Sequence, residues 1–133
     1  MNVWAVTTAR LIIASVCMFA LYELTGVISL HWRGDNCPML WVVPACYLVF
    51  FGYMVILLSV TLSFCRRLFV FLIGWTPVFI LAFTGTVLEL ASKPTCPRTV
   101  SDIPLCYLSL GIAGLLFVLF LFTIKKKQWI CRL

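Results

Sequence analysis

Four long apolar runs, separated by short polar connections, dominate the sequence. They extend from Leu11 to Leu30, from Met39 to Phe64, from Leu68 to Ala91 and from Ile103 to Ile124. A helix needs about 20 apolar residues to cross the hydrocarbon core of a bilayer. The runs are too long for strands and do not alternate between apolar and polar positions, and four strands cannot close a barrel. The pattern therefore predicts four transmembrane helices.

The three connections are short, which predicts that neighbouring helices run antiparallel. They extend from His31 to Pro38, from Cys65 to Arg67 and from Ser92 to Asp102. No small-x-small cleavage site follows the first run, so we expect it to remain as a helix rather than to be removed as a signal peptide. The expected fold is all-α, a four-helix integral membrane bundle that forms one domain over residues 1–133.

Composition supports a membrane protein and argues against a nucleic-acid partner. Apolar residues make up 64% of the chain and charged residues 11%, whereas soluble domains are about 45–50% apolar and about 25% charged. The net charge of +6 comes from residues between and beside the apolar runs, without a basic stripe interleaved with aromatic residues. The lipid bilayer is therefore the expected partner.

The distribution of Lys and Arg predicts the orientation in the membrane, because cytoplasmic connections carry an excess of both. Seven of the ten fall on one side, namely Arg10, Arg66, Arg67, Lys125, Lys126, Lys127 and Arg132. Arg33, Lys93 and Arg98 fall on the other. We expect both termini in the cytoplasm. The short outer connections without a glycosylation sequon favour a bacterial inner membrane.

The two halves of the chain share a sequence unit. Each contains Glu-Leu, then Cys-Pro, then Pro-x-Cys-Tyr-Leu, at Glu23, Cys37 and Pro44 in the first half and at Glu89, Cys96 and Pro104 in the second. This predicts two tandem, parallel helical hairpins, repeat 1 over about 8–64 and repeat 2 over about 68–124, related by an axis along the membrane normal.

Four cysteines fall at or near the outer side, where an oxidising compartment would convert them to disulfides. Four cysteines allow three pairings, and the repeat favours Cys37–Cys46 and Cys96–Cys106. The other cysteines, Cys17, Cys65 and Cys131, are expected to be reduced. We interpret the two bridges as structural staples.

The same features permit a redox interpretation. Four helices, cytoplasmic termini and two outward cysteine pairs resemble the plan of the DsbB family of quinone-linked thiol oxidases, and Glu23-Leu24-Thr25 leading to Cys37-Pro38 is similar to that family's first hairpin. The resemblance would make Cys37, Cys46, Cys96 and Cys106 redox-active and quinone the cofactor. The family's Cys-x-x-Cys pair is absent, since the first interval here is Cys-x8-Cys. A close pair favours a reactive disulfide, whereas a wider one is usually structural.

Four outer residues are candidates for binding a ligand, namely Glu23, Glu89, His31 and Arg33. Glu23 lies well inside the first run, and intramembrane carboxylates are costly and often functional. We expect His31, Arg33 or Thr25 to be its partner, and Glu89 to line an outer pocket with it. His31 is the only histidine, and with the cysteines oxidised no metal site is expected.

Further residues predict local structure. Ser101 and Asp102 have the chemistry of a helix N-cap and Pro104 suits a first turn. Pro77 should kink the third span, and Gly111 and Gly114 should allow the fourth to pack closely.

The sequence favours a small binding, transport-related or accessory membrane protein without catalytic residues or a cofactor, with another membrane protein or a second copy as a further partner. The alternative is a quinone-linked thiol–disulfide oxidoreductase. A third interpretation is the handling of a metal or small ion by Glu23, Glu89 and His31.

Overall fold

The computed structural model describes residues 3–34, 37, 39–62, 64–93, 96–98 and 102–124. In this part of the chain four helices and one short hairpin occur. The helices are α1 (Val3–His31), α2 (Ala45–Thr61), α3 (Phe64–Leu90) and α4 (Leu105–Ile124), and the strands are β1 (Met39–Leu40) and β2 (Val43–Pro44).

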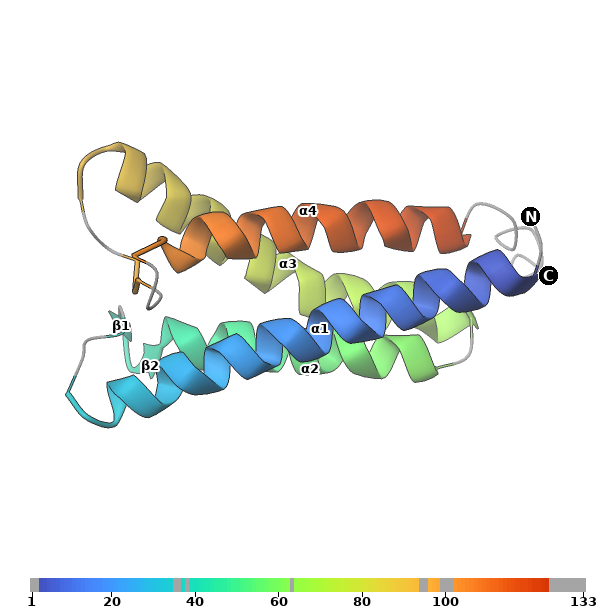
Figure 1. Cartoon of the computed structure of the whole chain (residues 1–133), viewed down its shortest axis with the longest axis horizontal. Coiled ribbons are helices and arrows are strands. Elements are labelled where there is room, and N and C mark those ends of the chain that lie inside the picture. Colours follow the sequence, from blue (N-terminus) through green and yellow to red (C-terminus); the bar gives the residue numbers. More distant parts are fainter. Residues whose placement is uncertain are drawn as a thin grey trace.

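The helices run up and down along one axis (Figure 1). The start of α1, the end of α2, the start of α3 and the end of α4 lie together at one end. We call this the basic end, because Arg10, Arg66 and Arg67 lie in the helix segments there. The hairpin and both disulfides lie at the opposite end, which we call the disulfide end.

Three helical segments are long and apolar enough to cross a membrane: Trp4–His31, Arg66–Leu90 and Leu105–Ile124. The remaining helix, α2, is apolar but has 17 residues. Large apolar side chains also cover the outer surface of the bundle, and the exposed fractions of Phe51, Phe69 and Phe122 are 69%, 70% and 54%. The helices are thus apolar on the faces that look away from the core as well as on those that form it.

The second apolar run is not helical throughout, in contrast to the prediction. Its first six residues, Met39 to Pro44, form the hairpin, and α2 begins at Ala45. Pro44 has no amide hydrogen and disfavours a helical conformation in the residue before it. Its extended backbone, with φ −61° and ψ 132°, directly precedes the helix. The fourth apolar run differs from the prediction in the same way, since its helix, α4, begins at Leu105 after Pro104 rather than at Ile103.

The boundary between the second and third runs also differs from the prediction. Arg66 and Arg67 were expected in the connection, but both belong to α3, which begins at Phe64. Arginine has a high helix propensity, so two of them do not prevent a helix from starting earlier. The predicted N-cap of the fourth helix is also wrong for Asp102, which has a φ of 61°; Ser101 lies outside the described residues.

Helices α2 and α3 cross closely at two glycines. A Cβ at Gly52 would meet the side chain of Val78 and lie 2.8 Å from the carbonyl oxygen of Gly74. A Cβ at Gly74 would lie 2.8 Å from the carbonyl oxygen of Gly52. The prediction had assigned close packing to Gly111 and Gly114, but nothing lies within 4 Å of a Cβ at either position.

Aromatic side chains join α3 to α4. Trp75 stacks between Phe79 and Phe117, with ring centroids 4.7 and 4.8 Å away, and its indole nitrogen donates a 2.9 Å hydrogen bond to the carbonyl oxygen of Ala113. Pro77 lies inside α3, as expected. Together with the glycine crossing, these contacts hold α3 against both α2 and α4.

Candidate functional site

Both connections at the disulfide end contain an antiparallel pairing beside a disulfide. Met39 pairs with Pro44 in the hairpin, and Arg98 pairs with Pro104 in an isolated bridge. In each case the cysteines lie two residues outside the paired positions, so they continue the same register. The Cα atoms are 6.6 Å apart in Cys37–Cys46 and 6.0 Å apart in Cys96–Cys106. These separations fall within the usual range for a disulfide of about 4.4–6.8 Å.

The predicted pairing is therefore the pairing in the structure. The two bridges differ in burial, because Cys37 and Cys46 are 4% and 6% exposed whereas Cys96 and Cys106 are half-buried. Cys17 is buried and unpaired. The side chain of Cys65 and the whole of Cys131 lie outside what the structure describes.

The second bridge packs directly on the backbone of α3. A Cβ at Gly85 would lie 2.5 Å from Sγ of Cys106 and 3.0 Å from Sγ of Cys96. Only glycine leaves room for the bridge at this distance. The bridge thus fixes Cys96 and the start of α4 against α3 near its end at the disulfide end.

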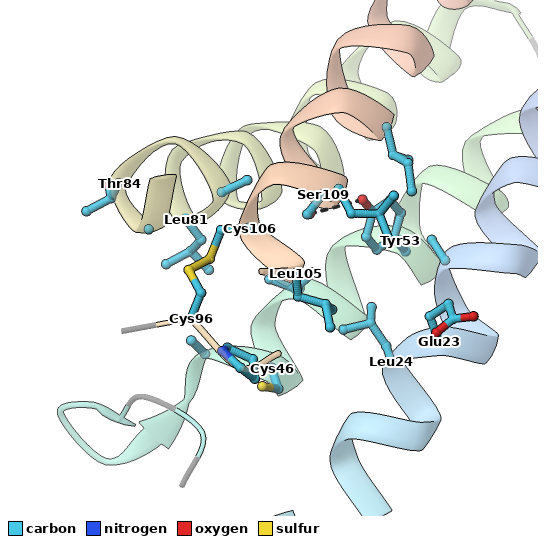
Figure 2. Close-up of a pocket in the computed structure, with 18 of the residues that line it drawn as sticks. Glu23, Leu24, Cys46, Tyr53, Leu81, Thr84, Cys96, Leu105, Cys106 and Ser109 are labelled. Carbon is cyan, nitrogen blue, oxygen red and sulfur yellow. Dashed lines mark hydrogen bonds between the residues drawn. A yellow bond between two sulfur atoms is a disulfide. The ribbon is translucent and has the colours of Figure 1, made fainter. Parts of the chain in front are cut away.

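A cavity of about 290 Å³ lies between the helices at the disulfide end. All four helices contribute to its wall, and Figure 2 shows how their side chains surround it. Most of the lining is apolar, including Leu24, Val49, Leu81, Leu105 and Ile112. Both disulfides contribute sulfur-bearing residues, namely Cys46 from one and Cys96 and Cys106 from the other. The structure therefore contains an apolar chamber next to two disulfides.

The polar groups of this cavity are few. The hydroxyls of Tyr53 on α2 and Ser109 on α4 lie 3.2 Å apart and share a hydrogen bond (Figure 2). Glu23 on α1 and Thr84 on α3 complete the set. A mainly apolar wall with a few fixed polar groups is the usual composition of small-molecule sites.

The predicted ligand-binding residues do not converge on this cavity. Glu23 lines it, but Glu89, His31 and Arg33 do not. Glu23 is half-buried and makes no hydrogen bond or ion pair with the residues that the structure describes. Two of the partners expected for it lie elsewhere, because His31 follows it by eight residues, about 12 Å along α1, and Arg33 lies in the turn after the helix ends. Thr25 donates instead to the carbonyl oxygen of Tyr22.

His31 and Arg33 lie where α1 ends. Nδ1 of His31 accepts a 3.3 Å hydrogen bond from the backbone nitrogen of Cys37. The neighbouring Trp32 donates from its indole nitrogen to the hydroxyl of Tyr47 over 3.0 Å. Arg33 is exposed in the following turn. This group of contacts attaches the end of α1 to Cys37 and to the start of α2.

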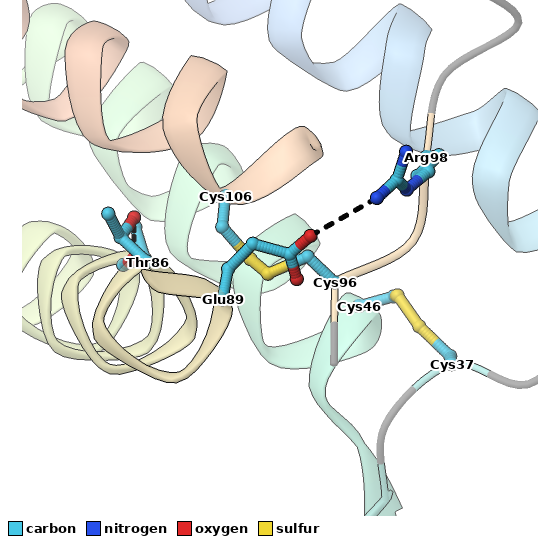
Figure 3. The surroundings of a disulfide bond; sticks show 8 residues. Cys37, Cys46, Thr86, Glu89, Cys96, Arg98 and Cys106 are labelled. Atoms are coloured by element: carbon cyan, nitrogen blue, oxygen red, sulfur yellow. Dashed lines mark hydrogen bonds and ion pairs between the residues drawn. A yellow bond between two sulfur atoms is a disulfide. The ribbon is translucent and has the colours of Figure 1, made fainter. Parts of the chain in front are cut away.

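Glu89 belongs to an ion-pair cluster above the second bridge. Arg98 lies 3.5 Å from Glu89 and 3.1 Å from Asp102 (Figure 3 shows the contact with Glu89). The hydrogen bond to Asp102, with the negative charges of Asp102 and Glu89, raises the pKa of Arg98 above its ordinary value. Two carboxylates therefore balance the positive charge of Arg98, which leaves little positive potential from this side chain to stabilise a thiolate at Cys96.

Among the described residues, no group of three or more His, Cys, Asp or Glu side chains could hold a metal ion. Comparison of the chain with protein-family models, with curated proteins and with solved structures finds no match.

Several residues of the site were not predicted from the sequence. Tyr53 and Ser109 are 56 positions apart, and their hydroxyls meet because α2 and α4 both pack on α1 and α3. Gly85 was not singled out, although small residues on a membrane helix, here Thr84, Gly85 and Thr86, are a signal of close approach. A search for glycines one helix away from each predicted disulfide could have found it.

Proposed function

We propose that this chain is a four-span membrane protein that binds a lipophilic small molecule in the cavity between its two helical hairpins. The cavity is the observation that carries the proposal. Its volume of about 290 Å³ is close to the lower end of ligand sites, about 300–1,000 Å³. Tyr53, Ser109 and Glu23 supply the polar contacts that orient a ligand. The protein acts as a binding, transport-related or accessory subunit rather than as an enzyme.

The apolar outer surface supports insertion into a bilayer. Helix α4 has no charged residue between Leu105 and Ile124, and a helix that is apolar on every face belongs in a protein core or in lipid. With 17 residues, α2 rises about 26 Å, near the lower limit for spanning. Lipid is the partner this surface requires, and another membrane protein or a second copy would bind the same surface.

The charge distribution supports an orientation with the basic end in the cytoplasm. Arg10, Arg66 and Arg67 lie at that end, and Lys125–Lys127, outside the described residues, directly follow α4 in the sequence. Basic residues are retained on the cytoplasmic side. The disulfide end then faces an oxidising compartment, which in a bacterial inner membrane is the periplasm.

The matched connections support a tandem repeat over about 8–64 and 68–124. Pro44 and Pro104 each directly precede a helix, and Cys46 and Cys106 are each the second residue of one. The shared register of the two disulfide-flanked pairings adds a structural likeness to the sequence unit.

A cavity-filling variant tests the binding proposal. The protein is extracted in lipid nanodiscs and analysed by native mass spectrometry for a retained small molecule. Ala20 is buried and lines the cavity, whereas Ala5 is exposed on the same helix. Ala20→Leu should reduce retention by about tenfold or more, a free-energy loss of about 1.4 kcal/mol. Ala5→Leu should retain the molecule, and equal retention by both variants would contradict the proposal.

One observation favours the redox alternative as a second candidate. Cys96 and Cys106 are half-buried and line the cavity, where a quinone would lie beside their sulfurs. Two thiols there would close to a disulfide while the quinone takes up two electrons and two protons and becomes a hydroquinone. Cys106→Ser would then trap a mixed disulfide between Cys96 and a soluble thiol partner. Recovery of that adduct would favour this candidate over the binding protein.

A further inference from the structure

The basic end contains a buried arginine without a hydrogen-bond partner. Arg67, in the first turns of α3, is 1% exposed. Its Nε and Nη2 atoms are both buried and make no hydrogen bond. Its guanidinium lies over the ring of Phe120 on α4, with Cζ 5.2 Å from the ring centroid, and that ring stacks on Phe71 at 3.7 Å. Aromatic rings therefore fix the guanidinium without satisfying its donors.

The electrostatic surroundings of Arg67 are positive. Arg10 on α1 is close enough to repel it, and Arg66 precedes it in the chain. The start of α3 adds the positive end of a helix dipole. A buried and ionised side chain is very costly unless an opposite charge pairs with it. The site therefore requires an anion.

None of the carboxylate side chains that the structure describes can supply that anion. The chain has four acidic residues, Glu23, Asp35, Glu89 and Asp102. Glu89 lies 22 residues beyond Arg67 on α3, about 33 Å along the helix, and Glu23 lines the cavity near the disulfide end. Asp102 lies before the start of α4, and Asp35, outside the described residues, follows Gly34 at the disulfide end in the sequence.

We propose that Arg67, with Arg10 beside it, binds a phosphate group at the basic end of the bundle. A guanidinium presents its donors in a planar fork that matches two phosphate oxygens. The site would lie at the level of phospholipid head groups, so an anionic phospholipid and free phosphate are the two sources of this chemistry. The site is independent of the cavity, which lies at the other end.

Thermal unfolding of the full chain in a neutral detergent tests the proposal. Phosphatidylglycerol should raise the melting temperature of the wild-type protein as a ligand that binds only the folded state does. Arg67→Met should reduce the affinity for phosphatidylglycerol, as derived from this shift in melting temperature, by about tenfold or more, since a hydrogen-bonded charge pair is lost. Arg66→Met removes the same charge from the exposed neighbour and is the matched control, which should respond like the wild type.

Further measurements distinguish phospholipid from free phosphate, and a second variant covers the case in which the first does not fold. A response to inorganic phosphate that also depends on Arg67 would identify free phosphate as the ligand; a response to phosphatidylglycerol alone would identify the lipid. If Arg67→Met does not fold, Arg67→Lys keeps the charge without the fork and should bind several-fold more weakly. Equal responses of the wild type and both Met variants would overturn the proposal.

A last measurement tests whether the C-terminal carboxylate of the chain is the anion that pairs with Arg67. Leu133 lies outside the described residues, and amidation removes its charge. If amidation destabilises the wild-type chain but not Arg67→Met in lipid-free detergent, the protein supplies its own anion and the proposal is overturned. Unchanged stability of both chains would support an external phosphate.

Discussion

Gly85 of α3 lies directly against Cys106 of α4, so close that a Cβ at position 85 would be 2.5 Å from the Cys106 sulfur. This contact links the fold to the candidate site. The same bridge lines the cavity, so whatever moves the bridge also reshapes the chamber. The helix backbone and the disulfide therefore act together as one wall.

Gly85→Ala should destabilise the protein by about 1–3 kcal/mol, because the added methyl group forces the bridge or the helix to shift. Gly111→Ala, made where nothing lies within 4 Å, should be neutral or stabilise by up to about 1 kcal/mol. Chemical unfolding in detergent measures both. In a Cys96→Ala/Cys106→Ala background the cost of Gly85→Ala should fall, and an unchanged cost would show that the sulfurs are not what the methyl group meets.

The crossing of α2 and α3 should be equally sensitive. Gly52→Ala places a methyl group 2.8 Å from the Gly74 carbonyl oxygen, and the helices must separate to accommodate it. We expect a loss of about 1–3 kcal/mol. Gly114→Ala, which meets nothing within 4 Å, is the control. A similar result for both variants would argue against close packing at the crossing.

Replacing Cys96 and Cys106 together by Ser should lower stability by about 2.5–3 kcal/mol, because a closed loop of about ten residues no longer restricts the unfolded chain. The measurement is the unfolding free energy with and without reductant. Disulfide formation in other cellular proteins should stay unchanged. A stable variant with impaired thiol oxidation would instead support the quinone-linked oxidoreductase.

Reporter fusions test the orientation. A reporter that is active only in the cytoplasm should work when fused to either terminus. One that is active only outside should work at Gly34, which lies in the exposed turn after α1 with a φ of 107°. The excess of Arg and Lys at the basic end is the physical reason. An outward C-terminus would contradict this topology.

The sequence was most informative where a local rule decides the structure. Apolar runs predicted four helices, and the repeated Pro-x-Cys unit predicted the partner of Cys46 and of Cys106. Local rules failed at helix starts, where Pro44 displaced the expected boundary, and at Arg66 and Arg67, where helix propensity outweighed charge. Nothing local indicates that Arg67 is buried, since the ring that it lies over, Phe120, comes from α4.

The candidate site was predicted only in part for the same reason. Glu23 was expected in a pocket, and it lines the cavity. Glu89 was expected beside it, but its ion pair with Arg98 holds it elsewhere. The pairing of Tyr53 with Ser109 depends on how α2 and α4 are placed around α1 and α3, a property of the whole bundle that no short stretch of sequence encodes.

The most direct test of the account is a structure of the protein in lipid nanodiscs, extracted from its own membrane without exchange into long-chain detergent. We predict continuous non-protein density in the cavity, in contact with Leu105 and with its polar end at the hydroxyls of Tyr53 and Ser109. The density should disappear in Ala20→Leu and remain in Ala5→Leu. A cavity that is closed by its own side chains, or that contains only water, would contradict the proposal that this protein binds a lipophilic ligand.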